Sequence, residues 1–600
     1  MKIVQILVAL LYISSGFSQI SNKYSISFDN AVHHEAKIEA VFSGLKTDTV
    51  SLRMSRTSPG RYALHEFAKN VYDVIVTDGQ GNKINVVRPN PHQWDISGHD
   101  GTIKLSYTLF ADRGDGTYSQ IDETHAHLNI PATFMYAPAL KDRSVEVTFN
   151  LRKDLNWKVA TQLIPKGDNI FTAPDLQYFM DSPVEISNHS TRSFKVTSEG
   201  EEYTIQLAIH HLGTEQEVDT YFEKIKKIVV QEKEVFGEYP KFDNGTYTFL
   251  ACYMPQVSRD GMEHRNSTIL TSTNSLSNGG MEKNIGTVSH EFFHAWNVER
   301  IRPKTLEPFD FEKANMSGEL WFAEGFTSYY TKLILCRAGL ISPEEYINGL
   351  TETYNYVWNS PARAYFNPTE MSYQAPFVDA ATSVDPVNIE NTFISYYSYG
   401  SMLGLALDLS LRNYKDSLHL DDYMKLIWEK YGKQEIPYTH NNLFTALQEY
   451  AGDTFANDFF NKYIHHSKIP DYQTLFADFG ILMQNDPKKP YYGALIAFDE
   501  NNNAVISNYP QKEGPAYNAG LEKGDVIVSV NGDSFKNPEE FLNLMAKITI
   551  DKKTPVTYLR LGKKITTQII FTADPNIEIV AQQNPDQKIL EKRKKWLQAK

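Results

Sequence analysis

The chain has 600 residues, too many for a single hydrophobic core, so we expect several domains. Its hydrophobic fraction of 41% and aromatic fraction of 12% are typical of a globular protein and exclude a largely disordered chain. The net charge of −14 argues against a nucleic-acid partner, because phosphate contacts require clustered lysine and arginine.

Residues 1–18 have the pattern of an export signal. Lys2 precedes an apolar run from Ile3 to Ile13, and small residues follow up to Ser18. The apolar run is too short to span a bilayer, and no later segment is long and apolar enough to do so. We therefore expect no membrane span and an exported protein, either periplasmic or secreted.

Residues 19–195 are predicted to form an N-terminal β-sandwich domain. Short runs such as Tyr24–Phe28 and Val145–Phe149 alternate polar and apolar side chains, as half-buried strands do. Turn-forming clusters such as Asp78–Asn82 separate these runs. Many short strands divided by turns are typical of a sandwich.

Two pairs of side chains leave alternatives open. His125 and His127 lie two residues apart on a predicted strand and share a face, so they could bind a metal, although a structural role is favoured. Cys252 and Cys336 are the only cysteines, which excludes a disulfide scaffold. They could pair, but buried free thiols are favoured.

Residues 196–482 are predicted to form a mainly helical domain, because apolar side chains recur every third or fourth position from about residue 217. Within it, the segment HEFFH at 290–294 places His290 and His294 on one face of a helix, where both imidazoles can converge on one metal ion. Glu291 then points towards the position that a catalytic zinc keeps open for water.

A third metal ligand is predicted downstream. Residues 320–335 form a predicted helix in which Glu324 lies among apolar side chains. Burial of a carboxylate is costly unless a charge pairs with it, and a zinc ion would do so. The alternative is that Glu324 pairs with an arginine or is exposed.

The C-terminal part is predicted to hold a third domain, residues 483–578, and a basic helical tail, residues 579–600. The segment 514–532 has the pattern of a short helix, a Gly-Asp turn, a strand and an Asn-Gly hairpin. The tail is expected to be in contact with solvent.

Five segments of the chain, taken in sequence order, resemble the glycyl aminopeptidase family of gluzincin metallopeptidases. The resemblance rests on SPGRYALHEFAKNV (58–71), YSQIDETHAHLN (118–129), HEFFHAWNVERIRP (290–303), WFAEGFTSYY (321–330) and the segment 514–532. It implies a multidomain α+β protein with an N-terminal β-sandwich, a thermolysin-like, mainly helical catalytic domain and a C-terminal PDZ domain.

The resemblance also implies an activity, zinc-dependent removal of N-terminal residues from peptides. One Zn²⁺ per chain would be held by His290, His294 and Glu324, in a site that polarises the scissile carbonyl and activates water. Glu291 would be the general base that takes the proton of the water and passes it to the leaving amine.

An oxyanion donor is implied by the segment 394–412. Relatives carry a catalytic tyrosine three residues before a glycine, which corresponds to Tyr397 before Gly400. They often have lysine immediately before that glycine, whereas this chain has Tyr399, so Tyr396 remains an alternative to Tyr397.

Substrate binding is implied at the segment DGMEHRNS, 260–267. It resembles the Gly-x-Met-Glu-Asn segment of related aminopeptidases, so Gly261 and Met262 would bind the substrate backbone and Glu263 would anchor its free amine. His264 stands where relatives have asparagine. The resemblance further implies a preference for small N-terminal residues, Gly and Ala.

The PDZ resemblance implies a second peptide site. Backbone N–H groups of Tyr492, Gly493 and Ala494 would face the terminal carboxylate of a peptide that adds a strand to the domain. Alternatively, the domain packs against the catalytic domain and binds nothing.

Two other functions remain open. A zinc endopeptidase would use the same chemistry but would not need Glu263. A non-catalytic PDZ scaffold with a structural zinc would have no use for a general base at Glu291. Peptides with free and blocked N-termini distinguish the first alternative from the aminopeptidase, and the Glu291→Gln variant distinguishes the second.

Overall fold

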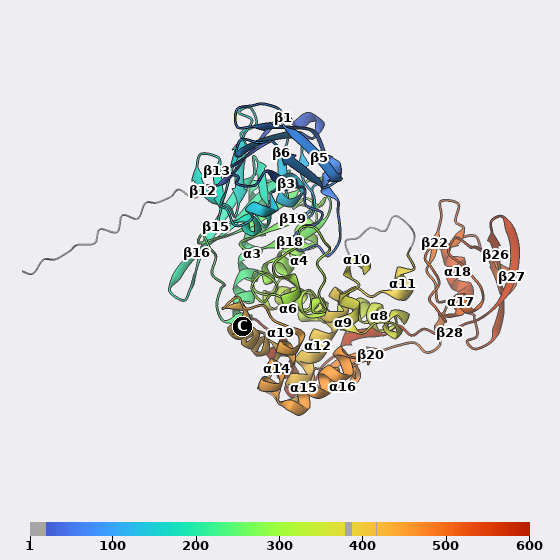
Figure 1. Cartoon of the computed structure of the whole chain (residues 1–600). Helices are drawn as coiled ribbons and strands as arrows, with labels where there is room; N and C mark the ends of the chain where they lie inside the picture. The colour runs from blue at the N-terminus through green and yellow to red at the C-terminus, as the bar shows by residue number, and fades with distance from the viewer. Residues whose placement is uncertain (1–19, 379–386, 416) are drawn as a thin grey trace, which may run out of the picture.

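The computed structural model describes residues 20–378, 387–415 and 417–600, so the predicted signal, residues 1–18, lies outside the described residues. Figure 1 shows three parts in chain order: sheets, a mainly helical body and a separate β domain. The predicted fold class is therefore confirmed. Within the described ranges, no helix has the length and apolar character needed to cross a bilayer.

The N-terminal domain consists of three sheets around one core. In sheet order, the first contains β12 (Ile164–Gly167), β13 (Ile170–Ala173), β10 (Val145–Asn150), β1 (Asn22–Asn30), β2 (Glu35–Ser43), β7 (Thr102–Phe110) and β4 (Val71–Asp78). The second contains β3 (Thr49–Arg53), β6 (Gln93–Ser97) and β5 (Asn85–Asn90). The third contains β11 (Lys158–Thr161), β14 (Val184–Ser187), β9 (His125–Leu128) and β8 (Gln120–Ile121). Strand β1 buries Tyr24, Ile26 and Phe28, as its period-two pattern predicts.

The central domain begins with a five-stranded sheet. Its strands are, in sheet order, β15 (Ser190–Ser198), β16 (Glu201–His211), β17 (Thr246–Tyr253), β19 (Ser267–Thr271) and β18 (Asp260–His264). The predicted domain boundary after residue 195 falls inside β15, which pairs along its whole length with β16. Strand β18 lies at the edge of the sheet and runs antiparallel to β19.

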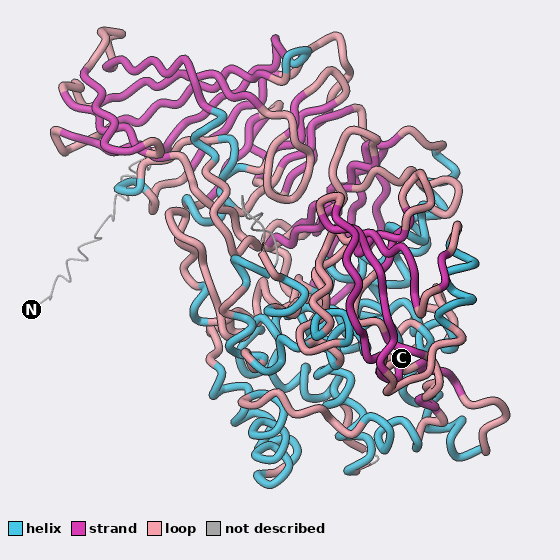
Figure 2. The backbone as a smooth tube through the Cα atoms, turned by 90° about the vertical axis from the view of Figure 1, so that its right-hand side faces the viewer, coloured by secondary structure: helices cyan, strands magenta, loops and turns pink. Residues whose placement is uncertain are grey.

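Helices pack below this sheet, on the side away from the N-terminal sheets (Figure 2). The longer ones are α3 (Glu215–Phe236), α4 (Gly280–Phe293), α6 (Gly325–Arg337), α8 (Leu350–Trp358), α12 (Tyr396–Tyr414), α13 (Leu420–Ile427) and α14 (His440–Ala451). The first of them starts with a reciprocal capping box of Thr214 and Glu217 and ends at Gly237, which has a positive φ of 85°. Short helix α5 (Leu320–Ala323) leads directly into α6.

Helices α6 and α12 approach each other through two glycines. A Cβ atom at Gly400 would lie 1.9 Å from the carbonyl oxygen of Trp321, and one at Gly325 would lie 2.3 Å from the Cα of Gly400. Only glycine fits at either position. Because Glu324 precedes Gly325 and Tyr397 lies one turn before Gly400, this contact brings two predicted site residues to the same region.

The Gly400→Ala variant is expected to lower the free energy of unfolding by about 1–3 kcal/mol, because the new methyl group can be accommodated only by moving backbone. Urea denaturation measures the change. Gly286→Ala is the matched control: it is also a helical glycine, and a Cβ there meets no atom within 4 Å. That variant should be neutral or stabilising by up to about 1 kcal/mol. Equal stability of both variants would contradict the packing argument.

The C-terminal domain is a sheet with two short helices. Its main strands are β22 (Ile496–Phe498), β23 (Ala504–Ile506), β24 (Val526–Val530), β26 (Lys553–Arg560) and β27 (Lys563–Ile570), with α17 (Pro515–Asn518) and α18 (Pro538–Met545). After it the chain returns to the central domain, where β29 (Glu578–Ala581) pairs antiparallel with β20 (Ile481–Gln484).

The prediction of a solvated C-terminal tail is wrong for its end. Helix α19 (Gln587–Leu597) buries Trp596 and Leu597 against the central domain. The Trp596 indole N–H donates to the Tyr329 hydroxyl at 3.0 Å, and Arg337 Nε donates to the Trp596 carbonyl at 3.2 Å. The tail carries a cluster of basic side chains, but these two apolar residues determine where it packs.

Candidate active site

Helix α4 and the start of α6 bring three predicted ligands together. The Nε2 atoms of His290 and His294 lie 3.1 Å apart, and Oε2 of Glu324 lies 3.5 Å and 3.2 Å from them, respectively. Donor atoms of a tetrahedral zinc with bonds of about 2.0–2.1 Å are separated by about 3.3 Å. The three side chains therefore fit a zinc ion. His290 and His294 lie close together because they are four residues apart on a helix. Glu324 comes from the start of another helix and reaches them through tertiary packing.

Each of these side chains is oriented by a neighbour. The Thr331 hydroxyl donates to the Thr327 carbonyl at 2.9 Å, so it accepts a hydrogen bond from Nδ1 of His290 at 3.1 Å. Nδ1 of His294 donates to the carbonyl oxygen of Asn297. Both rings therefore turn Nε2 to the centre of the site, the arrangement that metal-binding histidines need.

Glu324 is held by a residue from the N-terminal domain. The Tyr62 hydroxyl donates to Oε1 of Glu324 at 2.6 Å, 262 residues away in sequence. Oε2 is buried, faces the two imidazoles and has no hydrogen-bond donor among the described residues. Burial acts to raise the pKa of Glu324, but the imidazoles of His294 and His290 hold it well below its usual range, so the group is a carboxylate.

Two further carboxylates lie beside His294. One oxygen each of Glu263 and Glu291 and a ring nitrogen of His294 all lie within 4.8 Å of one another. Burial raises the pKa of Glu291 well above its ordinary value; His294 opposes this, and Glu263 and Glu324 add to it. Burial would lower the pKa of His294, but Glu324 and Glu263 outweigh it and raise that pKa to about 10. The site therefore concentrates negative charge and favours cations.

Two glycines allow this crowding. A Cβ at Gly261, on edge strand β18, would lie 2.1 Å from Oε1 of Glu291. A Cβ at Gly60, in the N-terminal domain, would lie 2.0 Å from Sδ of Met262 and 3.0 Å from Oε2 of Glu263. The N-terminal loop that holds Gly60 therefore packs directly on the Glu263 end of the site.

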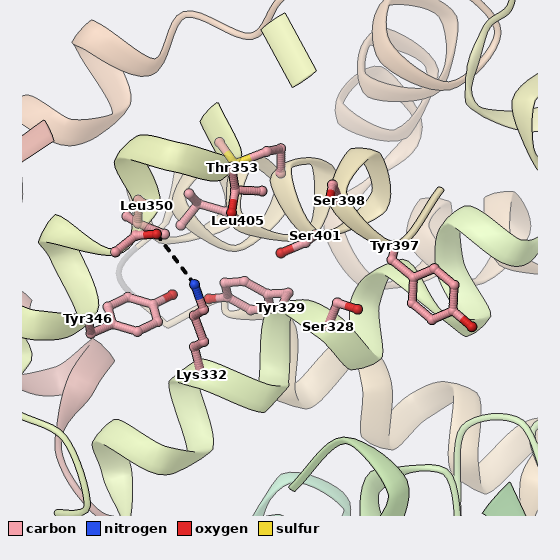
Figure 3. Close-up of a pocket in the computed structure, with 12 residues that line it drawn as sticks. Ser328, Tyr329, Lys332, Tyr346, Leu350, Thr353, Tyr397, Ser398, Ser401 and Leu405 are labelled. Carbon is pink, nitrogen blue, oxygen red and sulfur yellow. Dashed lines mark hydrogen bonds between the residues drawn. The ribbon is translucent and has the colours of Figure 1, made fainter. Parts of the chain in front are cut away.

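Of the two candidate tyrosines, Tyr397 lies beside the predicted metal ligand His290. Its ring centroid lies 5.8 Å from that of His290, and its side chain is partly exposed. Tyr396 is fully buried and packs edge-on against Tyr62, with centroids 6.0 Å apart. Tyr397 also lines a small pocket of about 130 Å³ between α6, α8 and α12. Figure 3 shows its hydroxyl pointing away from the other lining residues, such as Lys332.

The predicted PDZ residues precede the edge strand of the C-terminal sheet. The Tyr492 carbonyl accepts from Ala516 N–H at 2.9 Å, and the Gly493 carbonyl accepts from Gln511 N–H at 2.8 Å. Gly493 has a positive φ of 78°. Ala494 follows, partly buried against the core of this domain. Strand β22 has one free edge in the sheet order, and Leu495 beside it is 66% exposed.

No sequence pattern indicated the residues that orient the site, namely Tyr62, Thr331 and Asn297. Tyr62 lies in the segment 58–71 that carried the family resemblance, and Asn297 lies in 290–303, but neither pattern reveals a contact. The favoured interpretation of the cysteines is confirmed, since Cys252 and Cys336 are both free and buried.

Family models match three stretches of the chain. The peptidase M61 N-terminal domain matches residues 23–188, M61 glycyl aminopeptidase matches residues 283–403, and the PDZ domain matches residues 492–570. These stretches follow the order that the sequence motifs predicted, and the second one contains the predicted metal ligands His290, His294 and Glu324.

Solved and curated relatives cover different parts of the chain. An aminopeptidase N family protein from Idiomarina loihiensis shares the fold, with a TM-score of 0.83 and 21% identity over 96% of this chain and 100% of that one. A probable periplasmic serine endoprotease, DegP-like, from Brucella suis is 31% identical over 94 residues, 16% of this chain and 18% of the relative. Its Marinomonas counterpart is 34% identical over 93 residues, 15% and 20% of the two chains.

The chain thus spans about a fifth of the length of these curated relatives, whereas the M61 models match both its N-terminal and its central domain. The geometry of His290, His294 and Glu324 is in agreement with the order of the family matches. The chain is therefore similar to the M61 glycyl aminopeptidases in its N-terminal and central domains, and a PDZ domain follows them.

Proposed function

We propose that the protein is a zinc-dependent aminopeptidase that removes N-terminal residues, Gly or Ala by preference, from peptides. The observation that carries this proposal is the convergence of Nε2 of His290, Nε2 of His294 and Oε2 of Glu324 within 3.1–3.5 Å, with Glu291 beside them. The preference for small residues is supported by the family description.

His290, His294 and Glu324 are the proposed ligands of one zinc ion at this site. The orphaned Oε2 of Glu324 and the inward-facing Nε2 atoms are suitable donors. When bound, zinc acts as a Lewis acid towards a carbonyl oxygen and lowers the pKa of water. Tyr62 keeps Glu324 in place through the other carboxylate oxygen.

Glu291 is the proposed general base. It follows a metal ligand on α4, is buried, and has one oxygen, Oε2, without a hydrogen-bond donor among the described residues. Its raised pKa suits a group that accepts a proton from water and then gives it to the departing amine. Gly261 leaves the space that the carboxylate needs.

Glu263 is the proposed anchor of the substrate ammonium. Together with Glu291 and Glu324 it supplies three buried carboxylates, and a divalent ion plus one ammonium group would balance their charge. The packing of Gly60 against Glu263 and Met262 supports an exopeptidase, because it limits how far a peptide can extend beyond this end. Gly261 and Met262 lie on the edge strand β18, where an extended substrate backbone can pair.

Selectivity for a free N-terminus tests the aminopeptidase assignment. The protein should hydrolyse Ala- and Gly-peptides but leave their N-acetylated forms uncleaved, since acetylation removes the charge that Glu263 binds. Glu263→Gln should lower kcat/KM for free peptides about 10- to 150-fold, because a hydrogen bond to a charged group contributes about 1.5–3 kcal/mol. Cleavage of acetylated and free peptides at similar rates would instead indicate an endopeptidase.

Tyr397 is the proposed donor to the oxyanion. Loss of one such donor typically costs about 10²–10³ in kcat, so Tyr397→Phe should reduce kcat by that factor with little change in metal content. Tyr396→Phe is the matched control, since Tyr396 is buried against Tyr62, and it should keep most of the activity. Steady-state kinetics measures both effects. A large loss of kcat in Tyr396→Phe and a small one in Tyr397→Phe would make Tyr396 the oxyanion donor.

We further propose that the PDZ domain binds peptide C-termini. Support comes from the free edge of β22, from Leu495 immediately before it, which is 66% exposed, and from Leu542 on α18, which is 65% exposed. Helix α18 packs on this strand through Phe541, whose ring centroid lies 5.9 Å from that of Phe498. Tyr492, Gly493 and Ala494 form the proposed carboxylate-binding turn. The loop at 510–512 also contacts the central domain, where Gln511 Nε2 donates to the Asn359 carbonyl at 2.7 Å. The domain therefore packs on the enzyme while its edge strand stays open.

An exported location, in the periplasm or outside the cell, is also proposed. It is supported by the pattern of residues 1–18 and by similarity to relatives that are named as periplasmic.

A non-catalytic scaffold with a structural zinc is less well supported, because a buried general base would have no role there.

A further inference from the structure

Four potential metal ligands that the proposed reaction does not use meet between the N-terminal and central domains. His125 on β9 and Glu185 on β14 come from the N-terminal domain, while His210 on β16 and Cys252 on β17 come from the central sheet. All four are buried, with exposures of 0%, 1%, 8% and 1% in that order. Strands β9 and β14 belong to the third N-terminal sheet, which contacts the five-stranded sheet of β16 and β17.

The donor atoms are spaced like the corners of a coordination tetrahedron. Nδ1 of His125 lies 3.4 Å from Oε1 of Glu185 and 3.6 Å from Sγ of Cys252. Nδ1 of His210 lies 3.8 Å from the same oxygen and 3.4 Å from the same sulfur. A four-coordinate zinc requires about 3.3 Å between nitrogen or oxygen donors and about 3.6 Å between nitrogen and sulfur.

Neighbouring groups orient these donors inward. The side-chain amide N–H of Gln120 donates to the backbone carbonyl of Gln256 at 3.2 Å. Oε1 of Gln120 is therefore oriented to accept a hydrogen bond from Nε2 of His125 at 3.1 Å. Nδ1 of His125 therefore carries the free lone pair. Nδ1 of His127 lies 3.1 Å from the second carboxylate oxygen of Glu185. Such contacts to the far atoms of ligands are typical of metal sites.

Hydrogen bonds alone do not satisfy this cluster. Oε1 of Glu185 is buried and has no hydrogen-bond donor among the described residues. An uncompensated buried carboxylate oxygen is costly, and a cation at the centre would contact it and the other three donors together.

We propose that His125, Glu185, His210 and Cys252 bind a structural zinc ion that cross-links the N-terminal and central domains. A mixed set of imidazole, thiolate and carboxylate donors suits zinc, and four protein ligands leave no open position for catalysis. By joining the domains, the ion holds Tyr62 and Gly60 against the active site. The chain would then bind two zinc ions.

Metal content and cobalt spectra test the proposal independently of peptidase activity. Purified full-length protein should contain two zinc ions per chain. His294→Ala and Cys252→Ala should each retain one, and Cys336→Ala, a control at the other buried cysteine, should retain two. With cobalt(II) in place of zinc, thiolate-to-cobalt absorption should appear in the wild type and in His294→Ala, because the active site has no cysteine, and should be absent from Cys252→Ala.

If the wild-type protein binds one metal ion and shows no thiolate-to-cobalt absorption, the proposal is wrong. The four side chains would then form only a hydrogen-bonded cluster. The same conclusion follows if the absorption survives in Cys252→Ala. Should Cys252→Ala fail to fold, the cobalt spectrum and metal content of His294→Ala decide the question alone. Persistence of one thiolate-bound ion in that inactive variant would support this site whatever the outcome for the proposed peptidase.

Discussion

Treatment with a chelator is expected to abolish hydrolysis of alanine and glycine nitroanilides, and added zinc is expected to restore it. His290, His294 and Glu324 place their donor atoms 3.1–3.5 Å apart, a separation suited to one ion. Without a cation, no group at the site would act as the Lewis acid that polarises the scissile carbonyl and lowers the pKa of the attacking water. Initial rates, measured beside the metal content of the same samples, test the expectation.

The His294→Ala variant is the control for this experiment. It should stay inactive at zinc concentrations that restore the wild type, which would link the restored activity to His294. If protein without bound metal hydrolysed these substrates at the wild-type rate, the proposed chemistry would be wrong.

The Glu291→Gln variant is expected to lose about 10²–10⁴ in kcat, the usual contribution of a general base. Glutamine has nearly the same shape and fits beside Gly261, but it cannot accept the proton of the water. Because Glu291 is not among the proposed ligands, the metal content should not fall. Steady-state kinetics and metal analysis on the same preparation measure both quantities.

Glu282→Gln is the matched control on the same helix. Glu282 lies in the first turn of α4 and pairs with Lys224 at 2.8 Å on the surface, away from the site. This variant should keep its activity, since exposed ion pairs contribute only about 0–1 kcal/mol to stability. Equal rates for wild type and Glu291→Gln would leave the non-catalytic scaffold as the better hypothesis.

Local pattern in the sequence determined the elements and part of the site. The alternation in Tyr24–Phe28 predicted a half-buried strand, and that segment is buried on one face in β1. The spacing of His290 and His294 placed both on one side of α4, because four residues complete about one helical turn. Both inferences depend only on periodicities of the backbone, which a sequence shows directly.

Tertiary structure decided which distant side chains meet. The close approach of α6 and α12 at Gly325 and Gly400 fixes Glu324, and the hydroxyl of Tyr62 reaches Glu324 across 262 residues. Likewise, packing rather than composition buries Trp596 at the end of the basic tail. In each case the contact depends on how two separately formed surfaces fit together.

The cluster at the domain interface shows the same division. The sequence placed His125 and His127 on one strand face but left their role open, and it gave no reason to connect His125 with Cys252. The two lie on strands of different domains, and their atoms meet only because the sheets pack against each other. Sequence periodicity therefore determined the strands and helices of this protein, whereas the packing of its domains determined which polar side chains share a buried site.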